Sequence, residues 1–255
     1  MTTSRENGSL YTNIENKIAT VEFGHPASNS FPSVLLDRLE AEINKFSENK
    51  EVNVILLKSE GEKAFCAGAS FNELIEIDDL ESGKKFFSGF ANVINAMRSC
   101  NKLIVGRVQG KTVGGGVGLV SACDYAMATD AAAIKLSELS IGIGPFVIAP
   151  AVERKMGVGA LAELSLAAHE WKNAYWAKEK GLYAKVFDSI EDLDKEIELF
   201  TEKLASYNPD ALTQMKKTLW KNTDHWAHSL YENASVSGEL VLSDFTKNAL
   251  AKFKK

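Results

Sequence analysis

Residues 109–124 read QGKTVGGGVGLVSACD, and the glycines of this stretch are the strongest local signal in the chain. They stand between residues 103–108, which read as a strand buried on both faces, and a helix of small residues that continues through Ser121. Glycine lets the backbone approach a ligand closely, and the free amides at a helix start stabilise negative charge. Close packing of a helix on a strand is the simpler explanation, but the triplet 114–116 exceeds what packing usually needs. The stretch therefore predicts a ligand-binding turn.

Two nucleotide-binding motifs nearly fit the same stretch. Residues 106–112 approximate a P-loop, but the spacing is one residue short and Gly106 lies inside the predicted strand. Residues 116–121 approximate a dinucleotide fingerprint whose third glycine is replaced by Ser121. Glu138 follows about 20 residues later, where the ribose-binding acid of such a site would stand. A nicotinamide-dependent oxidoreductase is therefore an alternative at this point.

A second turn, AFCAGAS at residues 64–70, follows the apolar run 54–57. Its small residues leave backbone amides accessible, although alone it could be a tight turn into a loop. Paired with the triplet 114–116, it suggests two strand ends that present amides to one oxygen atom. That arrangement is the geometry of an oxyanion hole.

Strands and helices alternate along the first part of the chain. The pattern predicts a β-hairpin at residues 11–14 and 18–23, and further strands near 54–57, 103–108, 125–128 and 133–136. Apolar side chains at helical spacing predict helices near 34–46 and 86–97. From about Val147 onward helices follow almost without interruption, apart from a short strand near 184–187. The order predicts an α/β core over residues 1–190 with crossover connections, and a helical region over residues 191–255.

The last predicted helix carries an apolar face that would cap the core or pack on a neighbouring subunit, formed by Leu242, Phe245, Ala249 and Phe253. The acidic stretch 73–81 alternates carboxylates with Leu and Ile and has no histidine nearby. It predicts a solvated, mobile loop and not a metal site.

Bulk composition excludes several classes of protein. The chain has 255 residues, a net charge of −5 and an ordinary share of hydrophobic residues, 45 %, so it lacks the basic footprint of a nucleic-acid binder. No apolar run approaches the length of a membrane span, and residues 1–9 lack the apolar core of a signal peptide. Three cysteines without a CxxC pair suggest neither a disulfide framework nor a zinc site, and Cys66 and Cys123 are expected to be inert packing residues. The cytoplasm is the simplest compartment.

Other catalytic constellations are weaker. The chain has no GxSxG elbow, so a serine-hydrolase triad is not suggested. His225 and His228 have a spacing that could ligate a metal from one helix face, but no third ligand is in sight, so a surface or interface pair is favoured. His25 and His169 are isolated and are expected to be structural.

Four segments together resemble the crotonase, or enoyl-CoA hydratase/isomerase, superfamily. Residues 64–69 resemble its AFCAGAD turn, and residues 109–124 its NGxxxGGGxxLxxACD block. Residues 136–142, LSELSIG, are similar to its xPExxLG segment, and residues 177–186 to its AxxxGLVxxV stretch. The likeness spans essentially the whole chain with its order intact.

This resemblance implies a spiral of β-β-α repeats whose C-terminal helical region serves in trimerisation, so that the chain would form a homotrimer or hexamer. It also implies an acyl-CoA substrate whose thioester carbonyl is held by the amides of Ala69 and Gly115. No metal or redox cofactor is then expected, because coenzyme A is part of the substrate.

Departures from the family pattern bear on the reaction. Typical hydratases carry two glutamates; here the second matches Glu138, while the first matches Gly118, which has no side chain. Ser70 replaces the usual aspartate, and Pro145 and Phe146 replace a glycine-rich stretch. The resemblance places Gly118, Ser70, Pro145 and Phe146 around the substrate.

One glutamate suffices to move a double bond from the 3- to the 2-position, since it takes a proton from C2 and returns it at C4. Hydration is served better by two carboxylates that flank a water. Apolar neighbours of Glu138 favour a desolvated base with a raised pKa over a solvated turn residue. An enoyl-CoA isomerase is therefore predicted, with a 2-enoyl-CoA hydratase as the alternative and a non-catalytic acyl-CoA-binding paralogue as a further one.

Overall fold

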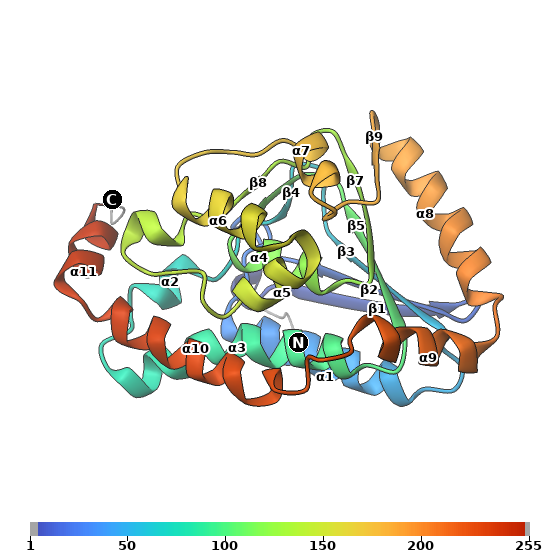
Figure 1. Ribbon diagram of the computed structural model, residues 1–255, viewed down its shortest axis with the longest axis horizontal. Helices are drawn as coiled ribbons and strands as arrows, with labels where there is room; N and C mark the ends of the chain where they lie inside the picture. The colour runs from blue at the N-terminus through green and yellow to red at the C-terminus, as the bar shows by residue number, and fades with distance from the viewer. Residues whose placement is uncertain (1–4, 253–255) are drawn as a thin grey trace.

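The computed structural model describes residues 5–252, which build two β-sheets wrapped by helices (Figure 1). The large sheet has the strand order β1-β2-β3-β5-β7-β9, and only its β1–β2 pair is antiparallel. Its strands are β1 (Ser9–Glu15), β2 (Ile18–Gly24), β3 (Val54–Ser59), β5 (Leu103–Val108), β7 (Tyr125–Thr129) and β9 (Lys185–Phe187). The small parallel sheet contains β4 (Ala64–Cys66), β6 (Lys111–Val113) and β8 (Ile134–Lys135).

Successive strands alternate between the two sheets, so the chain winds as a spiral. From β3 onward, each turn supplies one strand to the large sheet and one to the small sheet, followed by a helical segment. In chain order these segments are α2 (Phe71–Leu74) with α3 (Leu80–Ser99), α4 (Gly115–Ala122) and the 3-10 helix η2 (Glu138–Ile141). The first turn is a hairpin followed by α1 (Ser33–Glu48). The predicted α/β spiral of β-β-α repeats is confirmed.

Local sequence explains the first elements. The hairpin turns at Asn16 and Lys17, whose φ angles of 50° and 65° suit the tight turns that join twisted antiparallel strands. In β5 every residue is buried, as predicted for a strand covered on both faces, and its one charged residue, Arg107, pairs with Asp194. The helices predicted near 34–46 and 86–97 are α1 and α3.

The rest of the chain is helical apart from β9, as predicted. Its elements are α5 (Ala149–Met156), α6 (Val158–Leu166), α7 (Ala174–Glu179), α8 (Ile190–Ala205), α9 (Pro209–Leu219), α10 (Trp226–Val241) and α11 (Asp244–Ala251). A short 3-10 helix, η1 (Arg5–Asn7), precedes β1. In Figure 1, α10 runs alongside α3 over much of its length, so the C-terminal region covers the core of its own chain.

Two details differ from the sequence predictions. The last helix is broken, because α10 ends at Val241 and α11 begins at Asp244 behind its Ser243 cap. Phe245 is 66 % exposed and Leu250 is the buried apolar residue of α11, while Phe253 lies outside the described residues.

The acidic stretch 73–81 is not simply a solvated loop. The carboxylate of Glu73 accepts hydrogen bonds from the backbone N–H and the hydroxyl of Ser33, at the start of α1. Asp79 caps α3 in a capping box with Ser82. Glu73 and Asp79 therefore accept hydrogen bonds from N–H groups at the starts of α1 and α3. The alternation of charged and apolar residues could not reveal these partners.

A buried ion pair joins α9 to the core. Asp124, just before β7, accepts hydrogen bonds from Lys216 Nζ at 2.7 Å, Trp220 Nε1 at 2.6 Å and the Ile104 backbone N–H at 2.7 Å. The side chains of Asp124 and Lys216 are 3 % and 2 % exposed. The aspartate that ends the glycine-rich block is therefore structural.

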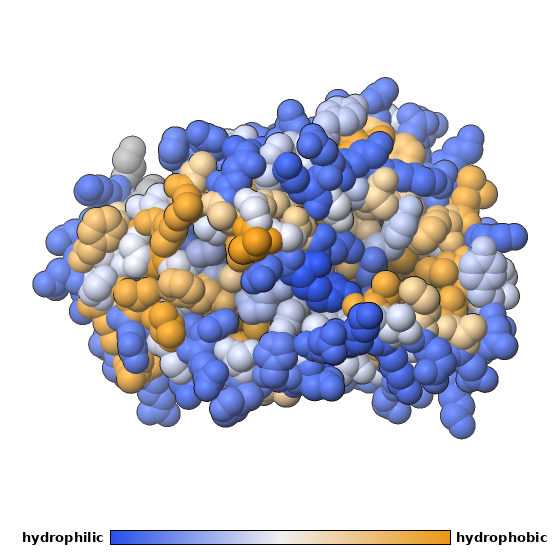
Figure 2. Space-filling model, viewed as in Figure 1, coloured by the Kyte–Doolittle hydropathy of each residue, from blue (hydrophilic) through white to orange (hydrophobic). Residues whose placement is uncertain are grey.

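Figure 2 shows hydrophobic side chains gathered over the half of the molecule where α6, α10 and α11 lie in Figure 1. Among the exposed large hydrophobic residues of these helices are Val158, Leu166, Val236 and Phe245. Such a surface suits contact between copies of the chain, and the trimer or hexamer stays a prediction. Within residues 5–252, no helix is both long and apolar enough to cross a membrane.

Candidate active site

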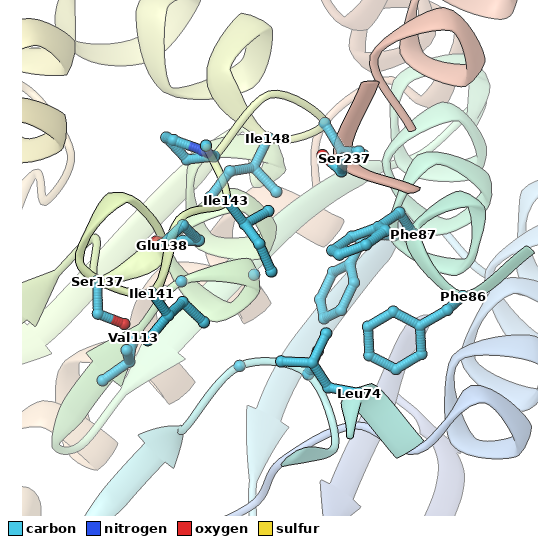
Figure 3. Close-up of a pocket in the computed structure, with 18 of the residues that line it drawn as sticks. Leu74, Phe86, Phe87, Val113, Ser137, Glu138, Ile141, Ile143, Ile148 and Ser237 are labelled. Atoms are coloured by element: carbon cyan, nitrogen blue, oxygen red, sulfur yellow. The ribbon is translucent and has the colours of Figure 1, made fainter. Parts of the chain in front are cut away.

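A mostly apolar cavity lies where the turns after the small-sheet strands meet η2, α3 and α10. Its volume is about 160 Å³. In Figure 3, Glu138, Ile141 and Ile143 face Leu74, Phe86 and Phe87 across it. The lining comprises Ala67, Gly68, Ala69, Phe71, Leu74, Phe86, Phe87, Phe90, Val113, Gly114, Gly115, Ser137, Glu138, Ile141, Ile143, Gly144, Pro145, Val147, Ile148 and Ser237. An apolar wall with a few polar groups is typical of a small-molecule site.

Two backbone amides lie unpaired at the edge of the small sheet. Strands β4 and β6 pair in parallel, so the turns that follow them lie at the same edge. A β-carbon on Gly68, whose φ is 91°, would lie 3.6 Å from the backbone nitrogen of Gly115, so the two turns touch. Within the described part of the chain, neither the Ala69 N–H nor the Gly115 N–H has an acceptor, whereas the N–H groups of Ser70 and Gly114 donate to the carbonyls of Phe31 and Lys135. Free donors at a helix start suit an oxygen that carries negative charge.

Gly114 adopts a backbone conformation that glycine alone tolerates well. Its φ and ψ are 53° and −122°, and its N–H donates to the Lys135 carbonyl of β8 at 2.9 Å. A β-carbon here would lie 2.9 Å from Oε1 of Glu138. Strand β8 therefore holds the turn of the preceding repeat against the Glu138 carboxyl group of its own repeat.

Glu138 begins η2 and points into the cavity (Figure 3). The residue is partly exposed, yet its Oε2 atom is buried and has no hydrogen-bond partner in residues 5–252. Burial raises the pKa of this carboxyl to about 7, and backbone hydrogen bonds from Glu138 itself and from Ser137 only partly oppose the rise. A carboxylate with such a pKa can take and return protons at neutral pH.

The structure brings together four of the predicted site residues and separates three from the cavity. Ala69, Gly115, Glu138 and Pro145 line it. The hydroxyl of Ser70 instead accepts a hydrogen bond from the Glu73 N–H and caps α2. The backbone carbonyl of Phe146 accepts a hydrogen bond from the side-chain amide of Asn233 on α10, and the Phe146 ring lies against Gly144.

Gly118 does not line the cavity, because Ile148 covers it. A β-carbon at Gly118 would lie 2.5 Å from Cγ2 and 2.6 Å from Cβ of Ile148, which itself lines the cavity. Placing Gly118 in the pocket was therefore wrong in detail: the neighbouring isoleucine fills the space that a side chain at this position would enter.

Sequence reasoning missed the aromatic wall and the contribution of α10. The cavity is lined by Phe86, Phe87 and Phe90 of α3, whose spacing predicted a helix but did not indicate that they line a cavity. Ser237 of α10 reaches the cavity from about 150 residues farther along the chain than these phenylalanines, and no sequence pattern marks it.

The remaining candidate residues lie elsewhere. Cys66 and Cys123 are fully buried, which raises the pKa of each thiol to about 12, so their interpretation as packing residues is confirmed. His225 and His228 are exposed, and His228 lies 3.5 Å from Glu232, so they form a surface pair.

Comparison with known proteins agrees with this geometry. The family model described as "Enoyl-CoA hydratase/isomerase" matches residues 13–254. A short-chain-enoyl-CoA hydratase of Clostridium acetobutylicum is 30 % identical over 207 residues, which cover 80 % of this chain and 78 % of that protein. A peroxisomal Δ(3,5)-Δ(2,4)-dienoyl-CoA isomerase of Arabidopsis thaliana is 27 % identical over 197 residues, 71 % of this chain and 69 % of that protein.

Solved structures show the same fold at lower identity. The crystal structure of an enoyl-CoA hydratase from Bacillus halodurans superposes with a TM-score of 0.87 at 17 % identity, over 95 % of this chain and 99 % of that one. A family match over nearly the whole chain, together with these relatives, establishes that the chain is a crotonase-fold enzyme that belongs to the enoyl-CoA hydratase/isomerase family.

Proposed function

We propose that this enzyme isomerises 3-enoyl-CoA to 2-enoyl-CoA, with Glu138 as its single acid-base residue. The observation that carries the proposal is that Glu138 is the one carboxyl group among the described residues lining the cavity, beside two unpaired amides. A reaction that one base can complete fits this site better than a reaction that needs two.

The proposed mechanism begins with the thioester. Its carbonyl oxygen accepts hydrogen bonds from the Ala69 and Gly115 amides, and the Glu138 carboxylate removes a proton from C2. The electron pair of the C2–H bond moves onto the carbonyl, which gives a dienolate across C1 to C4. The protonated Glu138 then donates to C4, and the double bond settles between C2 and C3. Proton and charge balance without a metal or redox cofactor.

The chemistry matches the environment of each group. Removing one donor from an oxyanion hole typically lowers kcat about 10²–10³-fold, so the two amides would supply much of the stabilisation of the enolate. The pKa of Glu138, raised by burial to about 7, lets it be ionised for proton abstraction and protonated for donation at the same pH. The apolar wall keeps water from competing for the enolate.

Hydration of 2-enoyl-CoA is the second candidate. The relative at 30 % identity is named a short-chain-enoyl-CoA hydratase, which favours it. Gly118 argues against hydration. Typical hydratases of the family carry a second glutamate at this position, and here Ile148 fills the space that such a side chain would need. A nicotinamide-dependent oxidoreductase is disfavoured by the family match.

Paired turnover assays distinguish these functions. The enzyme is expected to convert 3-hexenoyl-CoA to 2-hexenoyl-CoA and to leave 2-hexenoyl-CoA largely unhydrated. Faster hydration of the 2-enoyl thioester than isomerisation of the 3-enoyl thioester would assign the hydratase reaction. Binding of both thioesters without turnover of either would identify a non-catalytic acyl-CoA-binding paralogue.

A further inference from the structure

The side of the cavity opposite Glu138 is built from two helices far apart in the sequence. Phe86 and Phe87 project from α3, and Ser237 projects from α10 (Figure 3). Ser237 is only 1 % exposed and lines the cavity. These side chains form the distal wall, where a chain attached to the thioester would end.

A contact between two glycines holds the distal wall in place. A β-carbon on Gly83 of α3 would lie 3.0 Å from both the Cα and the carbonyl oxygen of Gly238 on α10. A β-carbon on Gly238 would lie 2.8 Å from the backbone nitrogen of Lys84. The two helix backbones therefore touch directly beside Ser237 and one turn from Phe87, so the wall cannot recede without separating the helices.

The size of the cavity limits its ligand. An apolar cavity of roughly 150 Å³ holds one benzene ring, a group of six heavy atoms. The cavity here, about 160 Å³, includes the amides of Ala69 and Gly115, so the same space must hold the thioester carbonyl and the acyl chain. Six heavy atoms correspond to a carbonyl oxygen with about five carbons.

The electrostatics of the cavity limit its ligand further. Within the described residues, no lysine or arginine lines the cavity, and Glu138 is the one ionisable group. A carboxylate at the end of the acyl chain would be buried without a partner, which is strongly unfavourable. The distal wall offers only phenylalanine rings and one hydroxyl.

We infer that the enzyme acts on short, uncharged acyl thioesters of about four to six carbons, and that Phe87 and Ser237 set this limit. The inference rests on the proposed function in one respect, that the thioester carbonyl lies at Ala69 and Gly115. It concerns binding and does not depend on which reaction Glu138 performs.

Equilibrium binding of unreactive ligands tests the inference separately from catalysis. Calorimetric titration of saturated acyl-CoAs from acetyl to decanoyl, with free CoA as the baseline, should show affinity rising by roughly fourfold for each methylene that fits. The rise should stop at four to six carbons, and octanoyl- and decanoyl-CoA should bind at least tenfold more weakly than the best ligand. Glutaryl-CoA should bind at least tenfold more weakly than pentanoyl-CoA, which has the same chain length.

Variants of the distal wall should move the limit in opposite directions. Phe87→Leu should shift the tightest ligand to a longer chain, and Ser237→Leu should shift it to a shorter one. Phe200→Leu is the matched control, because Phe200 of α8 stacks on Tyr125 outside the cavity. This control should leave the length profile unchanged.

Affinity that keeps rising through decanoyl-CoA would overturn the size limit, and glutaryl-CoA binding as tightly as pentanoyl-CoA would overturn the requirement for an uncharged chain. An unchanged profile in both wall variants would remove Phe87 and Ser237 as its determinants. A profile that peaks as expected in an enzyme without isomerase turnover would refute the proposed function and leave the length limit standing.

Discussion

The carboxylate oxygen Oε1 of Glu138 lies so close to Gly114 that a β-carbon on Gly114 would come within 2.9 Å of it. The glycine triplet thus does more than free the neighbouring Gly115 amide. It leaves room for the base, and it brings the proposed oxyanion site next to the proposed proton shuttle on η2.

Gly114→Ala should therefore damage both stability and catalysis. The φ of 53° with ψ of −122° would strain alanine by about 1–3 kcal/mol, and the new methyl group would push the Glu138 carboxyl away. A displacement of about 1 Å can lower turnover roughly 10²-fold. Gly61→Ala is the matched control, since Gly61 also has positive φ, 76°, but has open space around a β-carbon. Denaturant unfolding and steady-state kinetics on both variants separate strain from displacement; equal turnover in the two would contradict this role of Gly114.

The pH profile should report Glu138. Because the base must be ionised, kcat/KM is expected to rise tenfold per pH unit below about pH 7 and to level off above it. A profile that levels off near pH 4.5, the ordinary pKa of a glutamate, would show that burial does not tune this carboxyl.

The same pKa predicts a stability effect of defined sign. The folded protein holds the Glu138 proton up to about pH 7, while the unfolded chain releases it near pH 4.5, so stability falls as pH rises between these values. Above pH 7 the ionised, buried carboxylate should destabilise the fold by roughly 2–4 kcal/mol. Glu138→Gln should therefore be more stable than the parent at pH 8 and should lose that advantage at pH 4.5. Urea unfolding at the two pH values measures the difference.

Breaking the buried ion pair should be far more harmful than breaking a surface one. Asp124→Ala leaves the ammonium group of Lys216 buried without its partner, which is expected to cost about 3–5 kcal/mol. Glu42→Ala removes the partner of Lys45, whose side chain is 60 % exposed, and should change the free energy of unfolding by less than about 1 kcal/mol. Similar losses in the two variants would mean that Asp124 does not pin α9 to the core.

A second carboxylate at position 118 should require space for its side chain as well as the substitution itself. Gly118→Glu alone is expected to destabilise the fold by about 1–3 kcal/mol, because its β-carbon would collide with Ile148. Ile148→Ala would not help, since Cβ of Ile148 is itself 2.6 Å away, whereas Ile148→Gly removes the obstruction. The Gly118→Glu, Ile148→Gly double variant should recover stability and raise 2-enoyl-CoA hydration relative to isomerisation. If the single variant proves as stable as the parent, Ile148 does not exclude the second acid.

Sequence reasoning predicted the elements whose signals are local or periodic. The apolar runs gave the strands, the spacing of the phenylalanines gave α3, and the two small-residue turns marked the edge where Ala69 and Gly115 meet. Glu138 was found because residues 136–142 resemble a segment of the family that carries a glutamate, and its apolar neighbours favoured a desolvated base. In each case the physical cause lies within a few residues of the feature.

What sequence reasoning missed depends on contacts between distant segments. Ser237 lines the cavity only because Gly238 lets α10 lie directly on α3. Gly118 was placed in the pocket because it matches the position of the first glutamate in typical hydratases of the family, while the obstruction by Ile148 comes from the start of α5. Glu73 was assigned to a solvated loop because nothing near it in sequence reveals the Ser33 donors.

The central claim is that Glu138 alone moves the proton. The most direct measurement is single-turnover conversion of 3-hexenoyl-CoA by Glu138→Gln, with the affinity for hexanoyl-CoA measured on the same preparation. Glutamine keeps the shape of the side chain but cannot accept the proton, so turnover should fall about 10²–10⁴-fold while ligand affinity stays within a few fold of the parent's. Turnover at the parent's rate with unchanged affinity would show that another group is the base, and the single-glutamate mechanism would have to be abandoned.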